Sequence, residues 1–246
     1  MPFGEIVCGA PGNGKSTYCY GKHQLFTALQ RPISIVNLDP ANENIVPVCN
    51  RHLVSHHSSG CDGCARSWSE RGTFMLYCME YLEANFDWLE SRLHELRKDA
   101  HLAAVHLCDA HYVTDAVKYV SVLLLSLRTI LQLELPHINV LSKVDLLSQY
   151  GDLDFNLDFY TEVQDLSYLE NVLNTVSPRF TALNMAFISV IEDFGLVGSE
   201  TLAVEDKASI LHLSRVIGRA TGYIFVPPKD APIPEGIKTG SIRERK

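Results

Sequence analysis

The chain lacks any long uninterrupted run of apolar residues. The longest such run lies around Val120–Leu125, whereas a helix that crosses a membrane needs about 20 mainly apolar residues in succession. No basic segment followed by an apolar stretch stands near Met1, as a secretory signal would require. We therefore expect a protein without membrane contact that works in the cytoplasm.

Basic residues are scarce relative to acidic ones. The chain has 21 Lys and Arg against 29 Asp and Glu, which gives a net charge of -8 at pH 7. Proteins that hold nucleic acid through its phosphates present a basic surface. Direct binding of nucleic acid is therefore not expected.

Cysteine is present without the regular spacing of a disulfide framework. The seven cysteines are Cys8, Cys19, Cys49, Cys61, Cys64, Cys78 and Cys108. Several of them lie within apolar segments, as free thiols of a reducing compartment do. This distribution again favours a protein that is not secreted.

The composition is that of an ordinary globular protein, with 46% hydrophobic and 20% charged residues. A chain of 246 residues can bury one substantial core. We expect a single domain over residues 1–226, interrupted by an atypical polar loop at 51–74. The Pro-rich segment 227–246 is expected to be a disordered tail.

Apolar strands and amphipathic helices alternate along the chain, which predicts an α/β fold with a mostly parallel sheet flanked by helices. Residues 2–8 and 33–38 are expected to be strands that surround a helix at 16–29 in a βαβ unit. Further strands are expected at 101–109, 137–141, near 202 and at 223–226. The expected helices are 76–96, 115–133, 165–176, 180–194 and 206–221.

A glycine-rich loop follows the first strand. Residues 9–16 read Gly-Ala-Pro-Gly-Asn-Gly-Lys-Ser and fit the P-loop pattern, whose backbone N–H groups and following helix hold phosphates. Lys15 is expected to reach the β- and γ-phosphates, and the Ser16 hydroxyl to bind Mg²⁺. A glycine turn without a ligand is the alternative, but the strand before it and the helix after it favour the phosphate site.

A second motif follows the strand at 137–141. Ser142-Lys143-Val144-Asp145 resembles the Asn/Thr/Ser-Lys-x-Asp motif that reads guanine. An Asp carboxylate accepts hydrogen bonds from the ring N–H and the exocyclic amine of guanine, a pair of donors that adenine lacks. The position at the carboxyl end of a strand favours a ligand site, and an exposed helix start is the alternative.

Longer segments resemble the GPN-loop GTPases. They are GAPGNGKST, NLDPAN, LYCMEYLEANFDWL, HLCDAHYVTD, ELPHINVLSKVDL and FNLDFYTEVQDLSYL, spread over about residues 2–225. The resemblance implies a GTPase that uses GTP and Mg²⁺ and forms homo- or heterodimers with GPN-loop GTPases. It also implies partners among RNA polymerase II subunits or assembly factors, a role in assembly and nuclear import of that polymerase, and shuttling from the cytoplasm to the nucleus.

The resemblance also assigns individual residues. The phosphate loop corresponds to Gly12, Asn13, Gly14, Lys15, Ser16 and Thr17. Asp39 corresponds to an acidic residue that holds Mg²⁺ or its waters and, with Lys15, serves catalysis. Lys143 and Asp145 correspond to the base-reading pair, and Thr201 lies near the last guanine-contacting loop.

Two segments of the family pattern are missing. The chain contains neither a Gly-Pro-Asn tripeptide nor any Asp-x-x-Gly tetrapeptide. Five residues between Leu96 and Leu102 cannot hold a strand and its return crossover, which need a dozen or more, so one strand and crossover are expected to be missing. Lost coding segments and a genuinely shorter form both explain this gap. Nucleotide binding can survive it, whereas hydrolysis is expected to be impaired.

Three further interpretations stay open. A scaffold that holds nucleotide without turnover is one alternative to a GTPase, and a small-molecule P-loop kinase is another, although Arg215 and Arg219 are too few for an arginine-rich lid. In the loop at 51–74, side chains of metal-binding type gather: His52, His56, His57, Cys61 and Cys64. They could form a zinc site, but a solvated loop is the preferred interpretation.

Overall fold

The computed structural model describes residues 3–37, 49–52 and 101–223, the last range without 152, 164 and 177, and the single residues 80, 83, 84 and 87. Predictions for Asp39, the loop at 53–74, the tail at 227–246 and most of the helix at 76–96 lie outside these residues. The four single residues of that expected helix are helical.

The centre of the molecule is a four-stranded sheet in which every pair of neighbouring strands is parallel. Its strands are β1 (Phe3–Cys8), β4 (His101–Asp109), β5 (His137–Ser142) and β6 (Ser199–Leu202), in the spatial order β1-β4-β5-β6. The strands predicted at 2–8, 101–109, 137–141 and near 202 are thereby confirmed. Because the strands are parallel, their carboxyl ends meet at one edge of the sheet.

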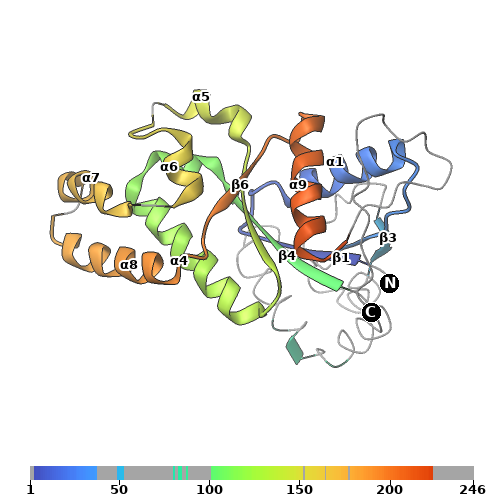
Figure 1. The fold of residues 1–246 in the computed structure, drawn as a ribbon, viewed down its shortest axis with the longest axis horizontal. Coiled ribbons are helices and arrows are strands. Elements are labelled where there is room, and N and C mark those ends of the chain that lie inside the picture. The colour runs from blue at the N-terminus through green and yellow to red at the C-terminus, as the bar shows by residue number, and fades with distance from the viewer. Residues whose placement is uncertain are drawn as a thin grey trace, which may run out of the picture.

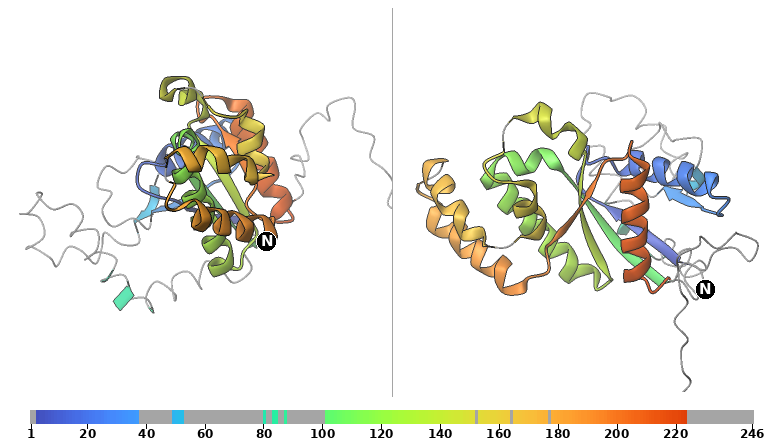
Figure 2. Two further views of the ribbon diagram at one scale, coloured as in Figure 1. Left: turned by 90° about the vertical axis from the view of Figure 1, so that its left-hand side faces the viewer. Right: turned by 45° about the horizontal axis from the view of Figure 1, so that its top comes forward.

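Helices cover both faces of this sheet (Figure 1). α1 (Lys15–Ala28) and α9 (Lys207–Ala220) pack on one face, while α4 (Ala116–Leu133), α7 (Leu169–Val176) and α8 (Thr181–Phe194) form the group at the left of Figure 1 on the other. The turned views of Figure 2 show the same division. The α/β fold with a mostly parallel sheet flanked by helices is confirmed.

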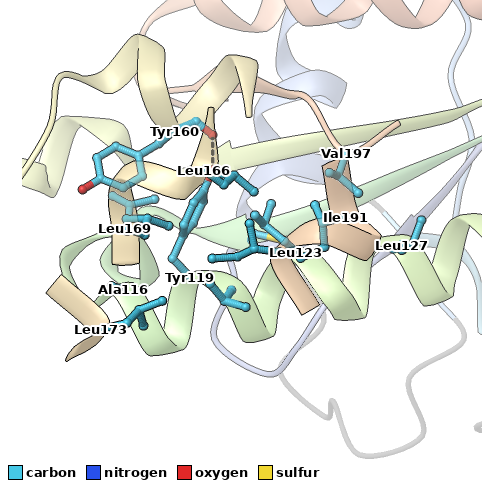
Figure 3. Close-up of a cluster of buried hydrophobic side chains, with 14 of the residues drawn as sticks. Ala116, Tyr119, Leu123, Leu127, Tyr160, Leu166, Leu169, Leu173, Ile191 and Val197 are labelled. Carbon is cyan, nitrogen blue, oxygen red and sulfur yellow. Dashed lines mark hydrogen bonds between the residues drawn. The ribbon is translucent and has the colours of Figure 1, made fainter. Parts of the chain in front are cut away.

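Two clusters of buried side chains hold these layers together, because residues that alternate along a buried strand point to opposite faces. Val105 and Leu107 of β4 face α1 and α9, whereas Cys108 faces α4. The larger cluster lies around α4 (Figure 3). There the Tyr119 ring packs edge-on against Tyr160 at 5.0 Å, and its hydroxyl donates to the Tyr160 carbonyl oxygen at 2.9 Å.

Short elements connect the main ones. The 3-10 helices are η3 (Ala110–Thr114), η4 (Val144–Leu146) and η5 (Leu166–Tyr168), and the short α-helices are α5 (Leu147–Tyr150) and α6 (Leu157–Glu162). The helix expected at 165–176 is therefore η5 followed by α7. The sequence analysis missed α6, because six residues are too few to show a helical repeat.

The predicted βαβ unit at the N-terminus is wrong in its strand pairing. β2 (Ile35–Asn37) pairs with β3 (Cys49–His52) in a separate two-stranded parallel sheet. Arg51 and His52, assigned to a loop by their polarity, lie in β3, since backbone pairing at an edge does not require apolar side chains. Within the described residues, β1 has a strand on one side only.

The open side of β1 is visible in its exposure. Phe3 and Ile6 are 40% and 37% exposed, whereas Ala103, Val105 and Leu107 of β4 are fully buried. Among the described residues β1 is thus the less buried of the two strands, and the missing strand and crossover expected from the sequence stay a prediction.

Among the described residues, α4 has the length and composition of a membrane-spanning helix, with a mean hydropathy of 1.5. Its inward side chains, including Tyr119, Leu123 and Leu127, belong to the larger buried cluster. The absence of membrane contact stays a prediction.

Candidate functional site

The candidate site lies at the edge where the carboxyl ends of β1, β4 and β5 meet. Strand register places Cys8 opposite His106, and Asp109 opposite Ser142. The loop after β1 and the loop after β5 therefore start next to one another. Open parallel sheets bind ligands at this edge.

The glycine-rich loop between β1 and α1 has a backbone that favours glycine at two positions. Gly9 has φ 141°, and a Cβ there would stand 2.3 Å from the carbonyl oxygen of Leu107. Gly14 caps α1 with φ 84°. These conformations allow the loop to pass close over β4 and then enter the helix directly.

α1 begins directly after the glycine-rich loop. Its N-cap is Gly14, whose carbonyl accepts from the Tyr18 N–H at 2.8 Å. The amino end of a helix carries the positive end of its dipole and favours anions, so this end is the candidate phosphate site. Within the loop before it, the Asn13 N–H donates to the Ala10 carbonyl at 3.3 Å.

Asn13 serves as an anchor of the loop rather than as an outward-facing side chain. It is 3% exposed, and its Nδ2 donates to the Leu107 carbonyl at 2.6 Å. The P-loop pattern permits any residue at this position. Its side-chain role could therefore not be read from the motif.

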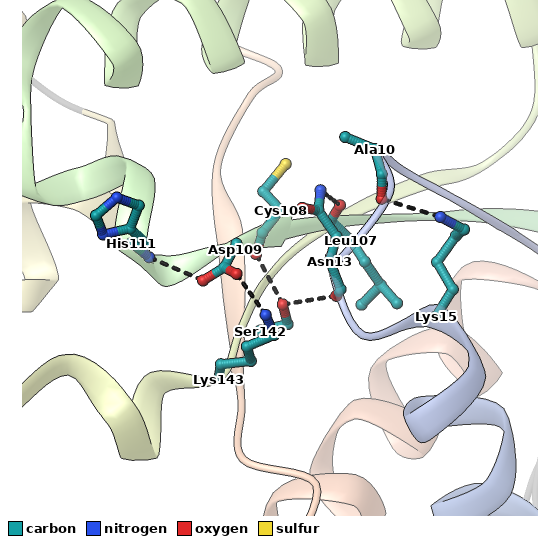
Figure 4. A network of polar contacts seen from close by, with 9 residues as sticks. All are labelled: Ala10, Asn13, Lys15, Leu107, Cys108, Asp109, His111, Ser142 and Lys143. Carbon is teal, nitrogen blue, oxygen red and sulfur yellow. Dashed lines mark hydrogen bonds and ion pairs between the residues drawn. The ribbon is translucent and has the colours of Figure 1, made fainter. Parts of the chain in front are cut away.

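The Lys15 ammonium lies across the glycine-rich loop (Figure 4). Its Nζ donates to the carbonyl oxygens of Gly9 and Ala10, both at 2.9 Å. An ammonium has three donors, so the loop fixes the cation while leaving capacity for one more acceptor. Ser16 and Thr17 follow in the first turn of α1, and both are exposed.

Ser142 connects the two loops. Its Oγ lies 2.9 Å from the Asn13 carbonyl oxygen and 3.0 Å from that of Cys108. Ser142 is 2% exposed, and its single proton can serve either acceptor. This contact fixes the glycine-rich loop against the loop that carries Lys143 and Asp145.

Lys143 adopts a left-handed backbone with φ 60°. Its Nζ lies 2.5 Å from Oδ2 of Asp109, and this hydrogen bond raises the pKa of the Lys143 ammonium. A Cβ built on Gly14 would lie 3.9 Å from the Lys143 Cε. The lysine stem thus runs beside the end of the glycine-rich loop.

Asp145 and Thr201, the remaining predicted residues, differ in their setting. Asp145 lies in η4 with an exposed side chain, and within the described residues its carboxylate forms no hydrogen bond or ion pair. Thr201 lies inside β6 opposite Leu141, and its carbonyl accepts from Ser209 at 3.5 Å. β6 ends at Leu202, so the loop at the site edge begins at Ala203.

Asp109 is the residue that the motif search did not single out. It ends β4, accepts from the His111 N–H at 3.0 Å through Oδ1 and binds Lys143 through Oδ2. The available signal was a carboxylate directly after a buried strand, at the ligand-binding edge.

A cavity of about 380 Å³ lies at the opposite edge of the sheet. Its lining includes His137, which begins β5, and Glu200 near the start of β6.

Of the proposed zinc ligands only His52 is described, and the described residues contain no cluster of three metal-binding side chains.

A solved structure shares this fold. An apo-form GTPase from Pyrococcus abyssi superposes with a TM-score of 0.64 over 89% of this chain and 97% of that chain, at 16% identity. The glycine-rich loop between β1 and α1, seated on this fold, defines a P-loop nucleotide-binding protein.

Sequence comparisons specify the class further. A family model described as "Conserved hypothetical ATP binding protein" matches residues 7–103 and 91–223. The GPN-loop GTPase QQT1 of Arabidopsis thaliana is 42% identical over 92% of this chain and 87% of its own length. GPN-loop GTPase 2 of Danio rerio is 41% identical, with 92% and 82% covered. The chain belongs to the GPN-loop GTPase family.

The comparison with the Arabidopsis protein also shows a difference in length within the aligned region. Its alignment runs over 268 positions although it covers 92% of a chain of 246 residues. The relative therefore contains residues without a counterpart here. This agrees with the missing segments inferred from the sequence.

Proposed function

We propose that this chain binds GTP together with Mg²⁺. The observation that carries the proposal is the Ser142 hydroxyl within hydrogen-bonding distance of the Asn13 carbonyl, because it joins a phosphate-binding loop to the segment that carries Asp145. A triphosphate on the glycine-rich loop would then have its base beside that segment. Lys15 would contact its β- and γ-phosphates.

The chemistry of Asp145 supports guanine over adenine. The description of the matching family model names ATP binding, whereas the relatives are named GTPases. The Asp145 carboxylate is exposed and has no partner among the described residues, so it can accept the ring N–H and the 2-amino group of guanine. Adenine offers no such pair of donors, so it would leave the carboxylate unpaired.

Mg²⁺ would be held by the Ser16 hydroxyl and by Asp39, both oxygen donors of the kind that this cation prefers. Mg²⁺ would neutralise charge on the phosphates, as in other P-loop proteins. Gly12, Gly14 and Thr17 would complete the cradle. Thr201 and the loop after it would border the base.

Hydrolysis by this chain is proposed to be much slower than in relatives with complete motifs. The chain has no Asp-x-x-Gly and no Gly-Pro-Asn, so charge stabilisation and water positioning at the γ-phosphate are incomplete. This absence favours a second candidate function, a nucleotide-bound scaffold that recruits partners without turnover.

The cellular role is proposed from the family resemblance. It comprises homo- or heterodimers with GPN-loop GTPases, and assembly and nuclear import of RNA polymerase II. The corresponding location is the cytoplasm, with shuttling to the nucleus.

Competition binding with GTP and ATP against a labelled guanine nucleotide tests the base assignment. The wild type should prefer GTP. Asp145→Asn should lose about 10- to 100-fold in GTP affinity, since hydrogen bonds to a charged group contribute about 1.5–3 kcal/mol. It should gain affinity for XTP, whose 2-carbonyl accepts from an amide N–H.

Asp193→Asn, which alters an exposed carboxylate at the end of α8, is the control and should leave all three affinities unchanged. Equal affinity of the wild type for GTP and ATP would refute the guanine assignment. Phosphate release in a single-turnover assay then separates slow hydrolysis from a scaffold without turnover.

A further inference from the structure

Asp109 stands at the point where β4 meets the two loops of the site. Register places it opposite Ser142, so its side chain lies next to Lys143 in the following loop. The Asp109 and Lys143 side chains are only 15% and 32% exposed. The pair is therefore half-buried and less open to water than a fully exposed surface pair, which contributes little.

The two carboxylate oxygens of Asp109 have different partners. Oδ1 accepts from the His111 N–H at 3.0 Å and caps η3, whereas Oδ2 binds the Lys143 ammonium (Figure 4). The His111 ring in turn packs edge-on against Tyr150 at 4.9 Å. The corner after β4 therefore holds both ends of the segment 143–150, in which Asp145 lies.

We propose that Asp109 is a positioning residue for guanine recognition, acting by holding the Lys143 stem beside Gly14 and the Asp145 segment at the site edge. This inference rests on the proposed function. With Asp109 in place the lysine is fixed before the ligand arrives, so binding does not have to order it. Without the carboxylate the ammonium turns to water and the stem leaves the glycine-rich loop.

Asp109→Asn separates this role from capping. The amide oxygen of Asn can still accept from the His111 N–H, but the charge that holds Lys143 is gone. We expect about tenfold weaker binding of a fluorescent guanine nucleotide. The melting temperature of the free protein should change little.

The affinity for inorganic tripolyphosphate distinguishes the proposed role from general damage to the fold, because general damage would weaken the binding of tripolyphosphate as well. Tripolyphosphate has no base, and by the proposed function it would occupy only the phosphate side of the site, so Asp109→Asn should bind it as the wild type does. The matched control is Asp115→Asn, which removes another carboxylate paired with a lysine, Lys118, at the start of α4. That variant should bind both ligands normally.

A double-mutant cycle identifies the partner through which Asp109 acts. In a Lys143→Met background, which keeps the stem but lacks the ammonium, Asp109→Asn should change guanine-nucleotide affinity less than about twofold. A tenfold loss in both backgrounds, or equal losses for tripolyphosphate and guanine nucleotide, would overturn the proposal. So would wild-type affinity of Asp109→Asn.

The affinity of the wild type for guanine nucleotide distinguishes failure of the proposed function from failure of the proposed role of Asp109. If the wild type binds no guanine nucleotide, the proposed function fails and this inference fails with it. If the wild type binds and Asp109→Asn binds equally well, this inference alone fails.

Discussion

The two sides of the site are built in different ways. The phosphate side consists of eight consecutive residues, 9–16, whose shape comes from glycine backbones and whose ammonium binds the loop's own carbonyls. The base side combines side chains from separate elements. Asp109 ends β4, Ser142 ends β5, and Lys143 follows it.

This difference explains how far each side depends on the rest of the fold. The phosphate side depends on glycine backbone conformations and on a close approach to the Leu107 carbonyl of β4. The base side needs the β4–β5 register, because that register brings Asp109 to Lys143. Perturbing the backbone should therefore damage the phosphate side most, and perturbing a buried side chain should damage the base side most.

Gly9→Ala should have the largest effect. The new Cβ would lie 2.3 Å from the Leu107 carbonyl oxygen, at φ 141°. Strain and overlap together should destabilise the fold by about 3–5 kcal/mol, measured by urea denaturation. Gly12→Ala is the matched control, because its φ is also positive but its Cβ would meet nothing within 4 Å. Equal losses for the two variants would show that close approach to β4 is unimportant.

Lys15→Ala should reduce GTP affinity about 100-fold, equivalent to roughly 2–3 kcal/mol for charge-assisted hydrogen bonds to phosphate. Titration calorimetry measures this loss. Lys118→Ala, which removes an exposed lysine paired with Asp115, should bind as the wild type does. An unchanged affinity of Lys15→Ala would contradict the assignment of the phosphate side.

Two thiols near the site should respond differently to alkali. Cys108 lies in β4 next to Asp109 of the base side, and Cys8 ends β1 just before the loop of the phosphate side. Burial raises the pKa of Cys108 from 9.0 to about 11, so the folded state keeps a neutral thiol that the unfolded chain ionises above pH 9.0. That stability is present below pH 9 and is lost as pH rises towards 11, by about 2 kcal/mol. Burial also raises the pKa of Cys8, and the Lys15 charge opposes this shift.

Urea denaturation at pH 8 and pH 11 checks this difference. Cys108→Ala should remove more of the alkaline loss of stability than Cys8→Ala does. The opposite order would mean that the Cys8 thiol, beside the phosphate side, is more strongly shielded from water than the Cys108 thiol, beside the base side.

Ser142→Ala should have the smallest effect, a loss of about 1–2 kcal/mol in the free energy of unfolding, because buried carbonyl groups lose a donor. Ser121→Ala, which removes an exposed hydroxyl bonded within α4, should cost less than about 0.5 kcal/mol. Thermal unfolding of both variants measures the difference. Equal values would show that the contact between the two loops contributes no stability.

Much of the fold could be predicted because hydrophobic periodicity is local. The mainly apolar run His101–Asp109 predicted β4 over its full length, and the apolar repeat of 115–133 predicted α4, which begins one residue later, after its N-cap Asp115. The pairing of β2 could not be predicted in this way. It depends on which strands stand beside β1, and the chain lacks residues that its relatives have.

In the candidate site, too, features carried by adjacent residues could be predicted, whereas features that depend on residues distant in sequence could not. The P-loop pattern located Lys15 and its loop, since the eight residues that define the pattern are adjacent in the sequence. The anchoring roles of Asn13 and Asp109 were not visible. Each depends on a contact with a residue distant in sequence, Leu107 and Lys143 respectively.

Hydrogen–deuterium exchange with and without GTP and Mg²⁺ tests the central claim most directly, because it reports on individual stretches of backbone amides. We predict slower exchange in peptides that cover residues 9–17 and 142–146. Protection confined to the opposite edge of the sheet, around His137 and Glu200, or no protection at all in the folded protein, would contradict the account.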